Sequence, residues 1–395
     1  MTKTPLFALT MAAAGAHAAD QLALAALPLL AVIVFQAPPD MVGVLVALHA
    51  AAWLVLALPG GVLVDRLPRG RAILWSQAAS ALGLSAAVYA VATGSLAGLG
   101  LATFVAAGGT VIGLLATGAL VPDLAPKPRW SEVNARIELA RAVAAVIAPS
   151  LAAYVIAGPW PAASLALAAC GALAAALWAG RLPTTETPPL VGREAPWRAA
   201  AAGLRFVMAE PNLRAIALCA LFWNFAFLGL VAVFVPYATE VLAMAPAAIG
   251  VALGAHGAGL ILGALLAPRV LSRLKLRWVM LGGPALSALA ILVLPWAPVP
   301  AYFLIGFGPM LWSIGRTGVC QAVSPAALLG RVAASIQFAV YGVRPLGALA
   351  CGAIAGSFGP SAALAAIGLG FALSFLAILV SPLARLASMP ERALA

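Results

Sequence analysis

A few ionisable side chains interrupt the long apolar runs of this chain, and they are the residues whose types and spacing could do chemistry. Asp20 follows His17 by three residues, so the two share one face of a helix. Apolar surroundings favour the neutral form of a carboxyl group, which would let Asp20 take up and release a proton. A permanently paired structural aspartate, and a histidine that is only packed or hydrogen-bonded, are the alternatives.

A second acid, Glu138, precedes Arg141 by three residues, which predicts an ion pair on one helix face. A pair that breaks when a cavity opens would act as a gate, and Glu138 could also join in proton coupling; a static pair is the alternative. Arg316 and Arg344 have no acid nearby in the sequence. Their partners must therefore come from a ligand, such as a substrate anion, or from other helices, for example Asp20 or Glu138.

Amide and aromatic side chains complete the candidate substrate-binding set. They are Asn224, Phe225, Gln321, Gln337 and Tyr341. Aromatic residues at helical spacing are more often packing residues than ligand contacts. We expect no metal site, because His49 and His256 fall on separate spans and a metal needs three or four converging ligands. No cofactor is expected either.

Membrane-spanning helices must position these residues. The chain has 395 residues, of which 64% are hydrophobic and 8% charged, too few polar residues to cover a soluble globule. A hydrocarbon core about 30 Å thick needs roughly 20 apolar residues per helix. Runs of that length predict about twelve spans, at 6–36, 41–63, 72–92, 96–121, 133–157, 160–180, 213–239, 247–270, 278–296, 300–322, 332–356 and 361–382.

Lys and Arg occur in every second connection between these spans, beginning with Lys3 and ending with Arg385 and Arg392. Basic connections stay on the cytoplasmic side, so we expect both chain ends there, in a bacterial-type cytoplasmic (inner) membrane. This topology accounts for the net charge of +11 better than nucleic-acid binding does. The amino-terminal apolar run resembles a signal peptide, but it continues to Phe35, which favours a span.

The longest connection, 182–212, contains a basic amphipathic stretch, Trp197 to Met208, which predicts a helix at the membrane surface. It separates an amino-terminal bundle of six helices, 1–181, from a carboxy-terminal bundle, 213–384, followed by a cytoplasmic tail, 385–395. The two halves resemble one another at an offset of about 200 residues. Paired halves of six spans are used by many transporters to alternate access around a site at the membrane midplane.

The segment between the second and third spans, Gly61 to Arg71, reads GVLVDRLPRGR and resembles the signature loop of the major facilitator superfamily. Pro68 stands where that family usually has its second glycine. An aspartate at this place could accept hydrogen bonds from helix amino-terminal N–H groups or an arginine, and so latch two bundles in one state. The alternative is an acid that balances its basic neighbours. The expected gating residues of the loop are Gly61, Asp65, Arg66, Arg69 and Arg71.

Further segments look like the enterobactin-exporter-like branch of that family. They are Gly203 to Val207, Gln321 to Arg331 and Gly342 to Gly347. The family's antiporter motif is present only in degenerate form at Ala148-Pro149, so it suggests the direction of transport weakly. We add Arg141, Pro149 and Pro345 to the expected gating residues.

These features predict a twelve-helix, all-α membrane protein in two pseudo-symmetric bundles, which the resemblance implies is a major facilitator fold. Its expected function is proton-coupled export of a small amphipathic, drug- or siderophore-like molecule by a monomer, with the proton gradient as driving force. Proton-coupled uptake of an organic anion or metabolite is the alternative. A membrane-embedded enzyme or lipid-handling protein is disfavoured, because no metal cluster, nucleophile with a base or phosphate-binding loop is evident.

Overall fold

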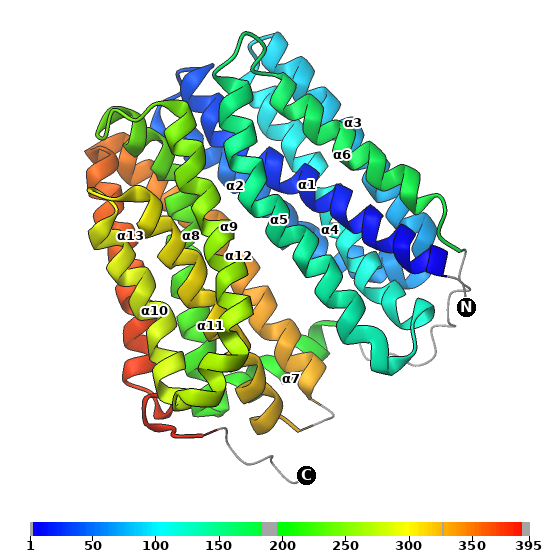
Figure 1. The fold of residues 1–395 in the computed structure, drawn as a ribbon, viewed down its shortest axis with the longest axis vertical. Coiled ribbons are helices and arrows are strands. Elements are labelled where there is room, and N and C mark those ends of the chain that lie inside the picture. Colours follow the sequence, from blue (N-terminus) through cyan, green and yellow to red (C-terminus); the bar gives the residue numbers. More distant parts are fainter. Residues whose placement is uncertain (1–2, 184–195, 326–327, 389–395) are drawn as a thin grey trace. The chain divides into compact units, whose positions relative to one another are not determined.

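A computed structural model of the chain describes residues 3–183, 196–325 and 328–388 (Figure 1). Part of the expected central connection, 184–195, and the end of the expected tail, 389–395, lie outside the described residues. The described elements are α-helices and short 3-10 turns. They are α1 (Lys3–Ile33), α2 (Pro39–Arg66), α3 (Arg69–Ala92), α4 (Leu96–Leu124), η1 (Lys127–Arg129), α5 (Trp130–Ile156), α6 (Ala163–Ala179), α7 (Pro196–Ala209), α8 (Pro211–Glu240), α9 (Pro246–Arg273), α10 (Leu276–Val293), α11 (Pro298–Val323), α12 (Leu329–Phe358), α13 (Pro360–Leu379) and η2 (Pro382–Arg385).

Each expected span corresponds to one helix, and the ends agree to within about three residues. Proline begins α2, α11 and α13, where its missing N–H is no loss because the first turn of a helix has unpaired donors. Gly94 and Gly359 take φ angles of +70° and +86° in two of the short turns, a conformation that favours glycine. The sequence therefore specifies both the helices and the turns between them.

Ten of the described helices are long and apolar enough to cross a membrane. Helix α6, with 17 residues, is a shorter apolar helix. Helix α11 is longer, but its apolar run is interrupted by Ser313, Arg316 and Thr317. With these two, the described residues form one helix at each of the twelve expected spans, as in an all-α membrane protein.

The amphipathic stretch predicted at 197–208 forms α7, which ends before Pro211. Helix α7 packs against α12. The contact is close at Gly203, because a methyl group there would collide with the backbone of Arg331 and with the hydroxyl of Ser335. Leu204 and Met208 remain exposed.

The chain divides into two compact units. Unit 1 comprises residues 1–189 and 235–254, and unit 2 comprises residues 190–234 and 255–395. Helices α8 and α9 each contribute residues to both units. The domain boundaries expected from the sequence stay a prediction.

In unit 1, α1 packs against α5 and α6, while α3 packs against α4 and α6, and α2 against α4. Small residues let these helices approach closely, as they do at many helix contacts within membranes. A Cβ atom on Gly15 of α1 would lie 2.7 Å from the carbonyl oxygen of Gly171 on α6. This contact fixes α1, which carries Asp20.

In unit 2, α10 packs against α11 and α13, and α12 against α13. Buried side chains from five helices, α8, α10, α11, α12 and α13, form its core, together with Val207 of α7. The indole of Trp223 on α8 donates a hydrogen bond to the Ser287 hydroxyl on α10, with 3.0 Å between Nε1 and Oγ. Unit 2 thus holds α8, α11 and α12 in fixed relation.

Candidate functional site

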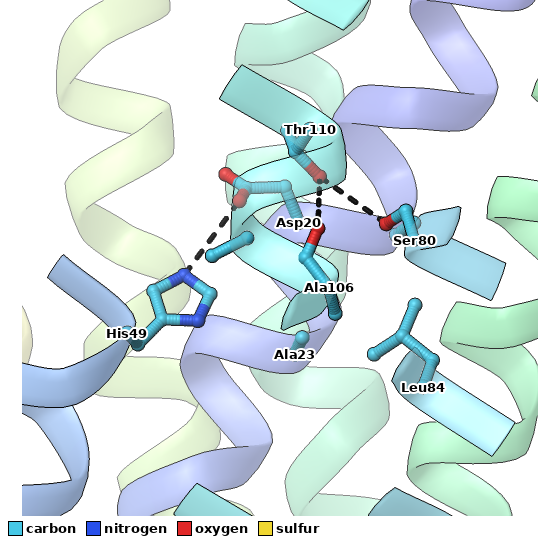
Figure 2. Close-up of a pocket in the computed structure, with 9 residues that line it drawn as sticks. Asp20, Ala23, His49, Ser80, Leu84, Ala106 and Thr110 are labelled. Carbon is cyan, nitrogen blue, oxygen red and sulfur yellow. Dashed lines mark hydrogen bonds and ion pairs between the residues drawn. The ribbon is translucent and has the colours of Figure 1, made fainter. Parts of the chain in front are cut away.

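A narrow polar crevice lies between the first four helices of unit 1 (Figure 2). Its polar side chains come one from each helix: Asp20 from α1, His49 from α2, Ser80 from α3 and Thr110 from α4. The rest of the lining is apolar, namely Ala19, Ala23, Leu84, Ala106 and Ala107. The crevice therefore places one carboxylate and one imidazole in a mostly apolar surrounding.

Asp20 and His49 point toward one another in Figure 2 and form an ion pair, with 3.6 Å between Oδ1 and Nε2. The second carboxylate oxygen accepts a hydrogen bond from Gln21 Nε2 at 3.3 Å. Both partners are sheltered, because the side chain of His49 is 7% exposed and that of Asp20 18%. The other ring nitrogen of His49, Nδ1, has no hydrogen-bond partner within the described structure. Hence the imidazole has one nitrogen toward the acid and one buried nitrogen that could take up a proton.

Ser80 and Thr110 complete the crevice. Their hydroxyl oxygens lie 3.4 Å apart, and Thr110 also donates to the carbonyl of Ala106 at 3.3 Å. The crevice is too narrow to hold a water molecule, whereas sites for drug-sized ligands measure roughly 300–1,000 Å³. Its size therefore excludes a cargo and suits a proton.

His17, expected on the same face as Asp20, is buried on α1. It lies within electrostatic range of Asp20, Glu138 and Arg141. Among the described residues, however, Asp20 forms its ion pair with His49, which lies on a different helix. From the sequence, His49 was considered only as a possible metal ligand and was rejected, so its contact with Asp20 was not predicted.

The expected contact between Glu138 and Arg141 is confirmed, with 2.7 Å between Oε2 and Nε. Glu138 is 60% exposed and Arg141 33%, so the pair lies on an open face of α5 within unit 1. Whether it opens and closes as a gate stays a prediction.

The loop motif at 61–71 spans the end of α2 and the start of α3. Asp65 and Arg66 form the last turn of α2, and α3 begins at Arg69. The guanidinium of Arg69 pairs with Asp123 on the last turn of α4, at 2.6 Å between Nη1 and Oδ2. Sequence analysis missed Asp123, because 54 residues separate it from Arg69.

The other motif residues have more open surroundings. Arg66 and Arg71 are exposed, and a Cβ atom on Gly61 would meet nothing within 4 Å. Pro149 and Pro345 lie inside α5 and α12, where each removes one backbone donor. Their gating roles, like that of Asp65, stay predictions.

Several candidate residues of the second half come together in unit 2. Arg344 on α12 donates from Nε to Asn224 Oδ1 on α8 at 2.9 Å, and its guanidinium lies 4.9 Å from the centroid of the Tyr341 ring. The amide of Asn224 in turn donates to the carbonyl of Ala220 at 2.8 Å. Phe225, the next residue on α8, packs its backbone against Gly347 of α12.

Arg316 on α11 is half-buried, and its guanidinium lies 5.5 Å from the Trp312 ring centroid. Gln321 and Gln337 are exposed. Their role in substrate binding stays a prediction. Among the described residues, no group of three or more His, Cys, Asp or Glu side chains could hold a metal ion.

A family model described as the Major Facilitator Superfamily matches residues 9–348 of the chain. The chain belongs to this superfamily. Its sequence is 28% identical over 302 residues to the enterobactin exporter EntS of Shigella boydii serotype 4, covering 74% of this chain and 71% of that protein. The EntS protein of Escherichia coli O1:K1 is also 28% identical, over 301 residues and with the same coverage.

Solved structures share the fold at low identity. A POT-family transporter in complex with 5-aminolevulinic acid superposes with a TM-score of 0.77 at 12% identity, covering 95% of this chain and 96% of that one. The nucleoside transporter NupG superposes with a TM-score of 0.75 at 13% identity, with 95% and 99% covered. The chain is therefore a membrane transporter of the major facilitator fold and not an enzyme.

Proposed function

We propose that this transporter exports a small amphipathic molecule in exchange for protons, by alternating access. The single observation that carries the proposal is the sheltered ion pair between Asp20 and His49. Ionisable groups at membrane depth are costly, so those that persist commonly mark proton or substrate pathways. Here an acid and an imidazole, both able to bind protons, face one another in a crevice too small for a cargo.

The pair provides a simple means of coupling. In the ion-paired form, Asp20 and His49 neutralise each other and His49 Nε2 holds the carboxylate. Protonation of Asp20 removes this attraction and frees the imidazole, so proton uptake changes the link between α1 and α2. A carrier that changes shape either with the pair protonated, or with the pair ionised and the cargo bound, but in no other form, would move one proton inward for each cargo molecule that it moves outward.

Two observations support export and the orientation. The similar proteins from Shigella boydii and Escherichia coli are enterobactin exporters, which supports efflux for this chain. The alternation of basic and uncharged connections supports both termini on the cytoplasmic side of a bacterial inner membrane. That the cargo is a small amphipathic molecule is a separate part of the proposal.

The experiment uses the purified full chain in liposomes that contain a pH-sensitive dye, under an imposed proton gradient. The cargo probes are naphthalene-2-sulfonate and ethidium, whose fixed charges prevent them from carrying protons as weak acids or bases. We expect probe-dependent proton movement in the wild type, with the probe moving toward the acidic side. Asp20→Asn should abolish proton movement, and His49→Gln should reduce it.

Asp40→Asn is the matched control, because Asp40 lies at the first turn of α2, away from the crevice lining. It should behave like the wild type. Probe flux with no proton movement in any variant would overturn proton coupling, and dependence on sodium would assign the crevice to that ion instead. Movement of the probe toward the alkaline side would favour uptake.

A further inference from the structure

We infer that unit 2 binds an anionic group of the cargo through Arg316 and Arg344, an inference that rests on the proposed transport function. The inference starts from the sequence of this unit. Its segments 211–234 and 255–388 contain no Asp or Glu, and the described acid of this unit, Glu210, lies between α7 and α8, where it accepts from Asn212 Nδ2 and the Leu213 N–H. Two arginines nevertheless lie inside α11 and α12, seven and fourteen residues before the carboxy-terminal ends of those helices.

Arg316 stands beside a second donor that lacks an acceptor. Its Nε atom is buried and has no hydrogen-bond partner within the described residues, and the same is true of Nε1 of Trp312. These side chains are one helical turn apart on α11, with the guanidinium near the indole ring. Arginine and the indole N–H can only donate, so the missing partner is an acceptor, and beside a permanent positive charge it is best an anion.

Arg344, on α12, supplies the second positive charge of unit 2. It donates to Asn224 on α8, and Arg316 on α11 acts electrostatically on the Cys219 thiol of the same helix α8. Arg344 uses Nε for Asn224 Oδ1, and that hydrogen bond fixes the plane of its guanidinium.

Aromatic rings on the same helix suit the rest of an amphipathic cargo. Trp223 and Phe227 are stacked with 4.8 Å between ring centroids, and Phe227 lies 5.1 Å from the His256 ring. Trp223 itself is directed toward α10 and α13, where its indole donates to Ser287 and its ring lies 6.0 Å from that of Phe371. We therefore assign the charge of the cargo to the arginines and its apolar part to contacts with α8. Unit 1 would then bind the proton, and unit 2 would bind the anion.

The test measures binding by calorimetry on the purified full chain in detergent, with naphthalene-2-sulfonate and its uncharged analogue naphthalene-2-sulfonamide. The wild type should bind the sulfonate about tenfold more tightly or better, as expected for one hydrogen bond to a charged group. Arg316→Gln and Arg344→Gln should each remove that preference, while Arg316→Lys should keep part of it. Arg269→Gln, which removes an exposed arginine near the end of α9, is the matched control and should bind like the wild type.

Equal binding of sulfonate and sulfonamide by the wild type, or no binding of either, would overturn the anion site. So would a preference that survives in Arg316→Gln and Arg344→Gln, since the arginines would then be structural. Helicity and gel-filtration profiles show whether each variant is folded, and Arg316→Lys keeps the test informative if Arg316→Gln is not. If the anion preference is lost but proton-coupled ethidium flux remains intact, the anion site is overturned and the transport proposal stands. If the anion binds but no protons move, the anion site stands and proton-coupled transport is overturned.

Discussion

The ion pair between Arg69 and Asp123 should contribute measurably to the stability of unit 1. The two charged atoms lie 2.6 Å apart, which corresponds to about 6 kcal/mol of attraction at an effective dielectric constant of roughly 20. Desolvation and the ordering of two flexible side chains offset most of this. Because the side chains are only 19% and 28% exposed, we expect a net coupling of about 1.5 kcal/mol, typical of a hydrogen bond between charged groups.

A double-mutant cycle measures this coupling. Arg69→Ala, Asp123→Ala and the double variant would be unfolded by titration with SDS in mixed micelles, with loss of helicity as the signal. The two single changes should each lower the free energy of unfolding by more than 1 kcal/mol, and the double change by clearly less than their sum. Additive effects, with a coupling below about 0.3 kcal/mol, would refute the reasoning and make the pair a surface contact of the kind that contributes little.

Three further changes test the packing, the arginine site and the topology. Gly15→Leu should separate α1 from α6 and leave little folded protein on gel filtration, whereas Gly118→Ala, on an exposed face of α4 where an added methyl group meets nothing within 4 Å, should leave the melting temperature almost unchanged. Asn224→Leu removes the acceptor of Arg344 Nε and should lower the free energy of unfolding by about 2 kcal/mol, while Asn224→Asp keeps the acceptor and should be milder. Cysteine replacing Arg71 should react with an impermeant maleimide only from the cytoplasmic side, and the same substitution at Gly94 only from the outside; the reverse pattern would overturn the proposed orientation.

The helices could be predicted from the sequence because each depends on its own residues. An apolar run of sufficient length, bounded by proline, glycine or charge, contains all that is needed to place a span. The amphipathic stretch at 197–208 gave α7 for the same reason. The contact between Glu138 and Arg141 was equally local, since residues three apart are neighbours on any helix.

The contacts between helices could not be predicted in this way. His49 meets Asp20 because α1 and α2 pack at one particular rotation and height, and nothing in either apolar run specifies that register. Asp123 and Arg69 belong to different helices and meet only through the packing of α3 on α4. The side chains that surround Gln321 and Gln337 depend on packing in the same way, and the expected role of these two exposed amides in substrate binding stays a prediction.

The close contact between α7 and α12 makes it possible to follow the movement of α12 with a label on α7. At Gly203 the backbone of α7 lies directly against Arg331 and Ser335 of α12, so we expect a shift of α12 to move α7 as well. Leu204, the next residue, is half exposed on α7. A fluorophore or spin label attached there would report the movement of the helix that holds Arg344, and if α7 lies at the membrane surface as expected, it would do so without disturbing the membrane interior.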